Sequence, residues 1–273
     1  MDMHRKYPKS NILDSVRDSG RDSVSSRRKL AEKTGAVLIA LLFWQAAAVL
    51  VDSSILIAAP SAVLRRFLLL WREDDFFQIV CFTFSHIAAG YLLAAFTGFL
   101  LAVTAAGLPV IEKLLWPWVV SVRSVPVASM VVMLLIWVSS RRLPVVISFL
   151  VVFPVVYNNV LSGMKHLDPE LEEMSAVFRI GRLRHFRYVA MPQLSPYLLS
   201  ACSVTAGMAW KAGVAAEIIG TPPLSVGKQI YQSKIWLDTE MLFAWTLMLV
   251  VLSVVFEKLI TALLKKLLKG GRT

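Results

Sequence analysis

The sequence has few charged residues and few cysteines. Charged residues make up 17% of the 273-residue chain, against about 25% in ordinary soluble domains. Two cysteines, Cys81 and Cys202, are too few for a disulfide framework or a paired C-x-x-C metal site. No G-x-x-x-x-G-K-[ST] loop occurs, because Gly220 and Gly227 are wrongly spaced and Gln229 follows the lysine. These absences argue against a disulfide-stapled protein, a metal cluster and an intrinsic ATPase.

Apolar residues are abundant. They make up 57% of the chain, and the mean hydropathy is +0.65. A bilayer-spanning helix needs about 20 apolar residues, and six segments come close to or reach that length: 35–52, 79–107, 116–139, 143–163, 195–220 and 241–264. Prolines at positions 117, 126, 144 and 154 interrupt the third and fourth segments. The pattern predicts an all-α polytopic membrane protein with about six transmembrane helices.

The basic residues predict the orientation of these spans. With the N-terminus inside, the cytoplasmic segments hold 20 Lys and Arg residues and the outer segments hold seven, with Arg141 and Arg142 as the main exception. This bias predicts a multi-pass protein of the plasma (inner) membrane with both termini in the cytoplasm. The net charge of +11 does not indicate nucleic-acid binding, because the basic residues flank apolar segments instead of gathering on one soluble face.

Four parts of the chain follow from this pattern. Residues 1–34 are expected to form a polar cytoplasmic tail, and residues 35–78 the first span and an outer loop with a short interfacial helix near 62–71. Residues 79–264 form the core, which contains a cytoplasmic loop at 164–192, and residues 265–273 form a basic C-terminal tail.

The polar loop at 164–192 predicts two short helices. Asp168 can cap a helix that starts at Pro169 and has glutamates in its first turn. Gly181 can end this helix, and a second short helix near 183–190 is expected to stop at Pro192. The loop is partly apolar on one face and basic around it. Two interpretations stay open: it docks into a groove on another protein, or it lies on the membrane surface against anionic lipid headgroups.

The same loop resembles the EAA loop of importer permeases of ATP-binding-cassette (ABC) systems. That pattern has a Glu-x-Ala, a glycine four residues later and a proline thirteen residues after the glycine. With its proline on Pro192, the glutamate falls on Glu173, the second alanine on Ser175 and the glycine on Arg179. The glycine permits a turn that disfavours a side chain, so Gly181 is expected to serve in place of Arg179.

Three further segments, 121–137, 154–171 and 207–220, resemble nitrate, sulfonate and taurine permeases of this class. The resemblance implies a type I ABC importer permease-like fold and a homodimer of this chain. It also implies two copies of a separate ATPase subunit, which bind the ATP, so that no cofactor belongs to this chain. The resemblance further implies an extracytoplasmic substrate-binding protein that docks on the outer face. The residues expected to couple to the ATPase are Glu173, Ser175, Phe178, Arg179, Gly181, Arg182 and Pro192.

Three charged residues fall within or near the predicted spans: Arg123, Lys211 and Glu217. A charge in the bilayer is costly and usually faces the bundle interior or an aqueous path. We therefore assign all three to the translocation path. The alternatives are that Lys211 snorkels or pairs with a helix end, and that Glu217 lies at the membrane interface. Trp210 is expected to be a packing aromatic.

The leading hypothesis is a permease subunit without catalytic or metal-binding residues, for a small anionic or zwitterionic solute such as nitrate, a sulfonate or taurine. A membrane-embedded scaffold or enzyme is the first alternative. It needs clustered catalytic side chains, for which the acidic residues 73–75 are the only candidate. A secondary transporter is the second alternative, and no internal repeat supports it.

Overall fold

The computed structural model describes residues 35–269 except 37, 52 and 54, and every regular element in this part of the chain is a helix. The predicted tail at 1–34 and the last residues of the basic tail lie outside it. The chain divides into two units, Met1–Ala62 and Val63–Thr273. In the first unit, the predicted first span is an apolar helix, Leu38–Val51. The predicted division at residues 34, 78 and 264 stays a prediction.

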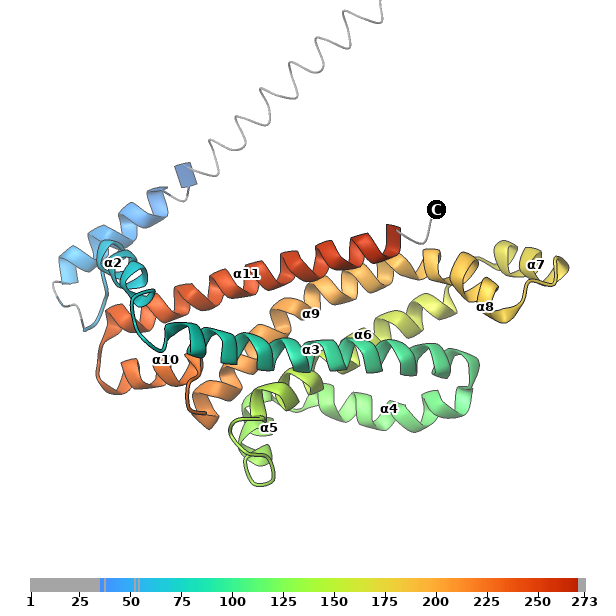
Figure 1. Cartoon of the computed structure of the whole chain (residues 1–273), viewed down its shortest axis with the longest axis horizontal. Coiled ribbons are helices and arrows are strands. Elements are labelled where there is room, and N and C mark those ends of the chain that lie inside the picture. Colours follow the sequence, from blue (N-terminus) through green and yellow to red (C-terminus); the bar gives the residue numbers. More distant parts are fainter. Residues whose placement is uncertain (1–34, 37, 52, 54, 270–273) are drawn as a thin grey trace, which may run out of the picture. The chain divides into compact units, whose positions relative to one another are not determined.

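The second unit holds a series of helices (Figure 1). The predicted short helix near 62–71 is α2 (Pro60–Leu70), whose first residues belong to the first unit. The others are α3 (Phe76–Gly107), α4 (Pro109–Ser124), α5 (Val127–Leu134), α6 (Leu143–Lys165), α7 (Pro169–Val177), α8 (Arg182–His185), the π-helix η1 (Phe186–Ala190), α9 (Met191–Gly220), α10 (Val226–Ile235) and α11 (Thr239–Lys269).

Among the described residues, three helices are long and apolar enough to cross a membrane: Phe76–Gly107, Leu143–Lys165 and Thr239–Lys266. They confirm the predicted segments 79–107, 143–163 and 241–264 as long apolar helices. Helix α9 covers the predicted span 195–220 but does not meet the same test. The total of six spans stays a prediction.

The predicted span at 116–139, which the sequence shows to be interrupted by prolines, is sharply bent in the structure. Helices α4 and α5 pass the length and hydropathy test together, but they are bent by 103° at a short break. Pro126 lies at this break, and the preceding Val125 is extended, with φ −83° and ψ 129°. A residue before proline avoids the helical region because its backbone clashes with the proline ring. The segment is therefore a broken span or a re-entrant loop.

The core lies where α3, α6, α9 and α11 meet. Its buried side chains include Tyr91, Val156 and Ala206, and the predicted packing aromatic Trp210 has its ring centroid 6.0 Å from that of Phe256. Helices α3 and α6 approach closely at Gly90, where an added Cβ would lie 2.3 Å from the carbonyl oxygen of Val145. Small residues permit such contacts between membrane helices.

The polar segments separate to opposite ends of this unit. Figure 1 shows α7 and α8 at one end of the bundle and α10 at the other. Helix α9 is continuous between the two ends and is about 45 Å long at 1.5 Å per residue. A movement of α7 and α8 can therefore reach the α10 end through one helix.

Candidate functional site

Helix α7 begins where the sequence predicts. The Oδ1 atom of Asp168 accepts a hydrogen bond from the Glu170 backbone N–H at 3.0 Å, and Pro169 is the first helical residue. Glu170 and Glu172 lie in the first turn, where the helix dipole favours negative charge. The side chain of Glu173 is exposed. The local cap and charges thus explain where this helix begins.

The turn after α7 is a Schellman motif, in which two backbone N–H groups satisfy the last helical carbonyls. Ile180 donates to the Ser175 carbonyl at 3.0 Å, and Arg179 donates to the Ala176 carbonyl at 3.1 Å. Arg179 has φ 51°, whereas Gly181 has φ −60°. The expectation that Gly181 provides the turn is wrong, because the motif requires the left-handed residue directly after the helix cap. Arg179 adopts the conformation that glycine favours.

We expect Arg179→Gly to stabilise this turn. The left-handed conformation costs a non-glycine residue about 1–2 kcal/mol, and the substitution removes most of that cost. Hydrogen exchange of the amides in residues 169–185 should slow by roughly fivefold for a gain of about 1 kcal/mol. Arg182→Gly is the matched control: it should not slow exchange, because Arg182 lies in helix α8. Equal effects of the two substitutions would contradict the assignment of strain to Arg179.

The second predicted helix does not stop at Pro192. Helix α8, the π-helix η1 and α9 follow one another without a break from Arg182 to Gly220, and Pro192 lies in the first turn of α9. A proline ring clashes with the carbonyl of the fourth preceding residue in an α-helix. Here that residue is Tyr188, inside the wider π-helical turn, and π-bulges of this kind accommodate such interruptions.

Two contacts tie α7 to the continuous helix. Nε2 of His185 lies 2.8 Å from Oε1 of Glu172. The backbone N–H of Asp168 donates to Oε1 of Gln193 at 2.8 Å. One tie therefore ends on α8 and the other on the first turn of α9. We call residues 168–193 the coupling elbow, after the role that the resemblance implies for this loop; its two arms are joined at the base by Asp168 and Gln193 and farther along by Glu172 and His185.

The tip of the coupling elbow exposes large apolar side chains. Val177, Phe178 and Leu183 are 79%, 73% and 82% exposed. The same segment exposes four arginines: Arg179, Arg182, Arg184 and Arg187. Exposed apolar residues surrounded by polar ones are typical of protein–protein or membrane interaction sites.

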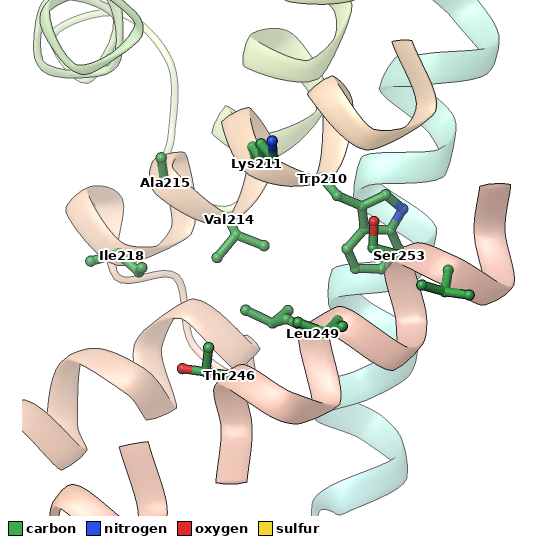
Figure 2. Close-up of a pocket in the computed structure, with 10 residues that line it drawn as sticks. Trp210, Lys211, Val214, Ala215, Ile218, Thr246, Leu249 and Ser253 are labelled. Atoms are coloured by element: carbon green, nitrogen blue, oxygen red, sulfur yellow. The ribbon is translucent and has the colours of Figure 1, made fainter. Parts of the chain in front are cut away.

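Lys211 lies on a cleft between α9 and α11 with a volume of about 390 Å³. Figure 2 shows Val214 of α9 and Leu249 of α11 pointing toward each other across it, with Thr246 and Ser253 on the α11 side. Lys211 is exposed to this cleft, and within the part of the chain that the structure describes its ammonium group forms no hydrogen bond or ion pair. The cleft is thus mainly apolar, with one cation and two hydroxyl groups.

Glu217 is fully buried and joins three helices. Its Oε2 accepts hydrogen bonds from the Thr83 hydroxyl of α3 and from the Gly227 backbone N–H of α10, both at 3.0 Å. Thr83 in turn accepts from the Val226 N–H at 3.0 Å. A Cβ on Gly227 would lie 2.3 Å from Cβ of Glu217, so only glycine fits there. We call these four residues the Glu217 hub; it holds the N-terminus of α10 against the core.

Arg123 lies elsewhere, on a small pocket between α4 and α6 that Tyr157 and Asn158 also line. The three residues assigned to the path therefore do not meet in either of these two cavities. Lys211 and Arg123 line separate cavities, and Glu217 lines neither of these two. Their assignment to the path stays a prediction.

The acidic residues 73–75, the candidate of the enzyme alternative, form an exposed turn between α2 and α3. Partial burial raises the pKa of Glu73, and the nearby guanidinium of Arg66 opposes this shift. Among the described residues, no three His, Cys, Asp or Glu side chains are grouped so that they could hold a metal ion. The turn thus carries acidic side chains without a histidine partner in the described part of the chain.

Comparison with known families gives the chain its class. The model of the family described as "Binding-protein-dependent transport system inner membrane component" matches residues 94–269. This match covers more than half of the chain and includes the coupling elbow, both cavities and most of the Glu217 hub. The chain belongs to this family. It is an ABC importer permease subunit and a multi-pass inner-membrane protein.

Individual relatives of this permease are named for three solutes. It is 26% identical over 237 residues to SsuC of Bacillus subtilis (strain 168), named for aliphatic sulfonates transport, with 86% of this chain and 84% of the relative covered. It is 24% identical over 149 residues to the nitrate import permease NrtB of Leptolyngbya laminosa. It is 26% identical over 150 residues to the bicarbonate transport permease CmpB of Synechocystis sp.. The last two alignments each cover 54% of this chain and 53% of the relative.

Sequence reasoning missed several residues of the permease. Glu172 and His185 are 13 positions apart, and Thr83 and Glu217 are 134 apart, so no local spacing connects them. Helix α10 falls in a segment that the sequence predicts to be an outer loop. Tyr157 and Asn158 could have been found, because polar residues within an apolar segment indicate a functional position in a membrane helix.

Proposed function

We propose that this permease imports a small anionic solute, and that an ATP-binding partner drives it by gripping the coupling elbow. The observation that carries the coupling proposal is the pair of ties at the base of an elbow with an exposed apolar tip. Phe178 and Leu183 suit the groove of a partner protein. The hydrogen bonds between Glu172 and His185 and between Asp168 and Gln193 link the motion of the tip to that of α8 and α9.

A pull on the elbow would therefore move α9. This helix carries Lys211 in the cleft and ends at the Glu217 hub, which holds α10. Closure of two ATPase subunits would rotate the helices between inward-open and outward-open states. In this proposal, α9 transmits the motion of the ATPase subunits to the outer end of the permease. It can do so because it is anchored to the coupling elbow at one end and to the Glu217 hub at the other.

The proposal of an anionic solute rests on two positively charged side chains, Lys211 and Arg123. Lys211 lies on α9 and Arg123 on α4, and neither has an ion pair among the described residues. A charged side chain within a bilayer costs at least about 2.5–3.5 kcal/mol, which is tolerable if it faces water or an anion. Relatives named for sulfonate, nitrate and bicarbonate transport agree with this chemistry.

The proposed assembly contains two copies of this chain, two ATPase subunits and an extracytoplasmic binding protein. The ATPase subunits would grip the elbows on the cytoplasmic side, where both termini also lie. The binding protein would dock at the opposite end, near α10, where Trp236 is 80% exposed. ATP would bind to the partner subunits.

Arg182→Glu tests the grip on the elbow. Arg182 is exposed beside the apolar tip, and reversing its charge places an unmatched acid in the interface. The tagged wild-type chain should bring an ATPase subunit through affinity purification, and Arg182→Glu should lose most of it. Arg142→Glu is the control, because Arg142 is exposed between α5 and α6. Retention of the ATPase by Arg182→Glu, or its absence from the wild type, would refute the coupling proposal.

Lys211→Ala tests the path. Loss of the charged group that lines the cleft should reduce uptake of the anionic solute about tenfold, the loss expected for one charge-assisted interaction. Lys211→Arg should retain most of the uptake because it keeps the charge. ATPase co-purification should stay at the wild-type level. Uptake by Lys211→Ala with unchanged rate and selectivity would remove Lys211 from the path.

A further inference from the structure

A second cavity of about 140 Å³ lies between α4 and α6. It is small, and its lining combines polar and apolar side chains. The polar ones are Glu112, Arg123, Tyr157 and Asn158, and the apolar wall includes Trp116 and Val119. This composition differs from that of the α9–α11 cleft, where Lys211 is the only charged residue among the described ones.

The hydroxyl group of Tyr157 is the first sign that a ligand belongs here. The side chain is 2% exposed, and its hydroxyl has no hydrogen-bond partner in the described part of the chain. Buried polar groups in proteins are nearly always paired, and an unpaired one costs about 1–3 kcal/mol. A residue that lines a cavity and keeps an unpaired donor can recover this energy when a ligand accepts the bond.

The charges around the cavity favour an anion. Nζ of Lys165 lies 2.6 Å from Oε1 of Glu112, so the acidic residue of the lining is already neutralised. Arg123 has no ion pair in the described part of the chain. The unpaired charge that faces a ligand in this cavity is therefore the positive charge of the Arg123 guanidinium.

We infer that this cavity is an oxyanion subsite of the permease, formed by Arg123, Tyr157 and Asn158. A guanidinium presents a planar fork of N–H donors that matches two oxygens of an oxyanion. The tyrosine hydroxyl and the asparagine amide add donors of the neutral kind. The class of ligand is a small oxyanion: nitrate, bicarbonate or the head group of a sulfonate, whose alkyl part would lie against Trp116 and Val119.

The residues that line the cavity are spread along much of α4. Glu112 and Arg123 are 11 residues apart on α4, or about 16 Å along the helix axis. The lining residues on α4 thus lie between the start of this helix and the break at Pro126. As a subsite of transport, this inference rests on the proposed function. It adds a second anion-binding position, on different helices from Lys211.

Binding to the full-length chain in phosphatidylcholine nanodiscs tests the inference. Sodium ethanesulfonate, sodium nitrate and sodium bicarbonate are titrated separately against sodium chloride at equal ionic strength. Specific binding to the folded state raises the unfolding midpoint. At least one of the three oxyanions should raise the unfolding midpoint of the wild type more than chloride does. Tyr157→Phe and Arg123→Gln should each weaken the apparent affinity for that oxyanion about tenfold. Arg123→Lys should weaken it less, and the control Arg142→Gln should leave it unchanged.

The outcomes distinguish an oxyanion subsite from a lipid-binding site. No oxyanion-specific stabilisation of the wild type, or equal stabilisation of the wild type, Arg123→Gln and Tyr157→Phe, would overturn the inference. So would an Arg123-dependent stabilisation by nanodiscs containing phosphatidylglycerol but by none of the small anions, because the occupant would then be a lipid phosphate. ATPase co-purification reports the proposed function independently. If the ATPase co-purifies with Arg123→Gln but this variant does not bind the anion, both proposals stand. If no ATPase co-purifies with the wild type, only the proposal of coupling to an ATPase fails.

Discussion

Replacing Glu217 by alanine should strongly destabilise the permease. The substitution removes the acceptor of two buried hydrogen bonds and leaves the Thr83 hydroxyl and the Gly227 N–H without this partner. Each unsatisfied buried group costs about 1–3 kcal/mol, and the lost volume adds a cavity. We expect a loss of about 2–5 kcal/mol in the free energy of unfolding. Thermal unfolding of the detergent-purified chain measures it.

Glu217→Gln is the matched control, because the amide keeps one oxygen that can accept both bonds. It should unfold within a few degrees of the wild type, whereas Glu217→Ala should unfold well below it. Gly227→Ala should disrupt the same contact, because the added Cβ would lie 2.3 Å from Cβ of Glu217. It should therefore resemble Glu217→Ala. Wild-type stability of both alanine variants would show that the Glu217 hub does not hold α10 to the core.

Replacing Phe178 by aspartate should strongly reduce ATP-driven uptake while the fold is kept. Phe178 is 73% exposed at the tip of the coupling elbow, so its removal leaves no cavity in the chain itself. Buried aromatic anchors at interfaces contribute about 2 kcal/mol or more, and an unpaired carboxylate in the same groove adds a penalty. Uptake by the complete transporter should fall at least about thirtyfold, and the thermal unfolding midpoint of the isolated chain should change little.

Trp236→Asp is the control for Phe178. Trp236 is an equally exposed aromatic residue, 80% accessible, but it follows α10 at the opposite end of the bundle. This variant should bind the ATPase subunit at the wild-type level. Unimpaired uptake by Phe178→Asp would show that the tip is not the gripped surface, even if the rest of the elbow contacts the partner.

The locally encoded features could be predicted from the sequence. Three apolar segments appear as long helices because a run of apolar residues determines burial in lipid whatever its neighbours are. Asp168 and Pro169 start α7 because a cap acts within one turn. The spacing of the coupling loop also identified position 179 as special, and Arg179 has the left-handed backbone expected of the family's glycine.

The non-local features required the tertiary structure. The sequence predicts that Pro192 ends a helix, yet the π-helical turn before it lets α9 continue, and no residue pattern announces that turn. The ties of the coupling elbow and the Glu217 hub join residues that are distant in sequence.

The sequence by itself therefore determined that this protein has long apolar helices and a polar loop between them, because hydropathy and capping act over a few turns; the permease class came from the resemblance of that loop to a known family and from the family match. Only the tertiary structure decided that Lys211 faces a cleft, that Glu217 is buried in a hub and that Arg123 shares a cavity with Tyr157. The physical reason is that helix rotation and packing depend on side-chain contacts between segments far apart along the chain.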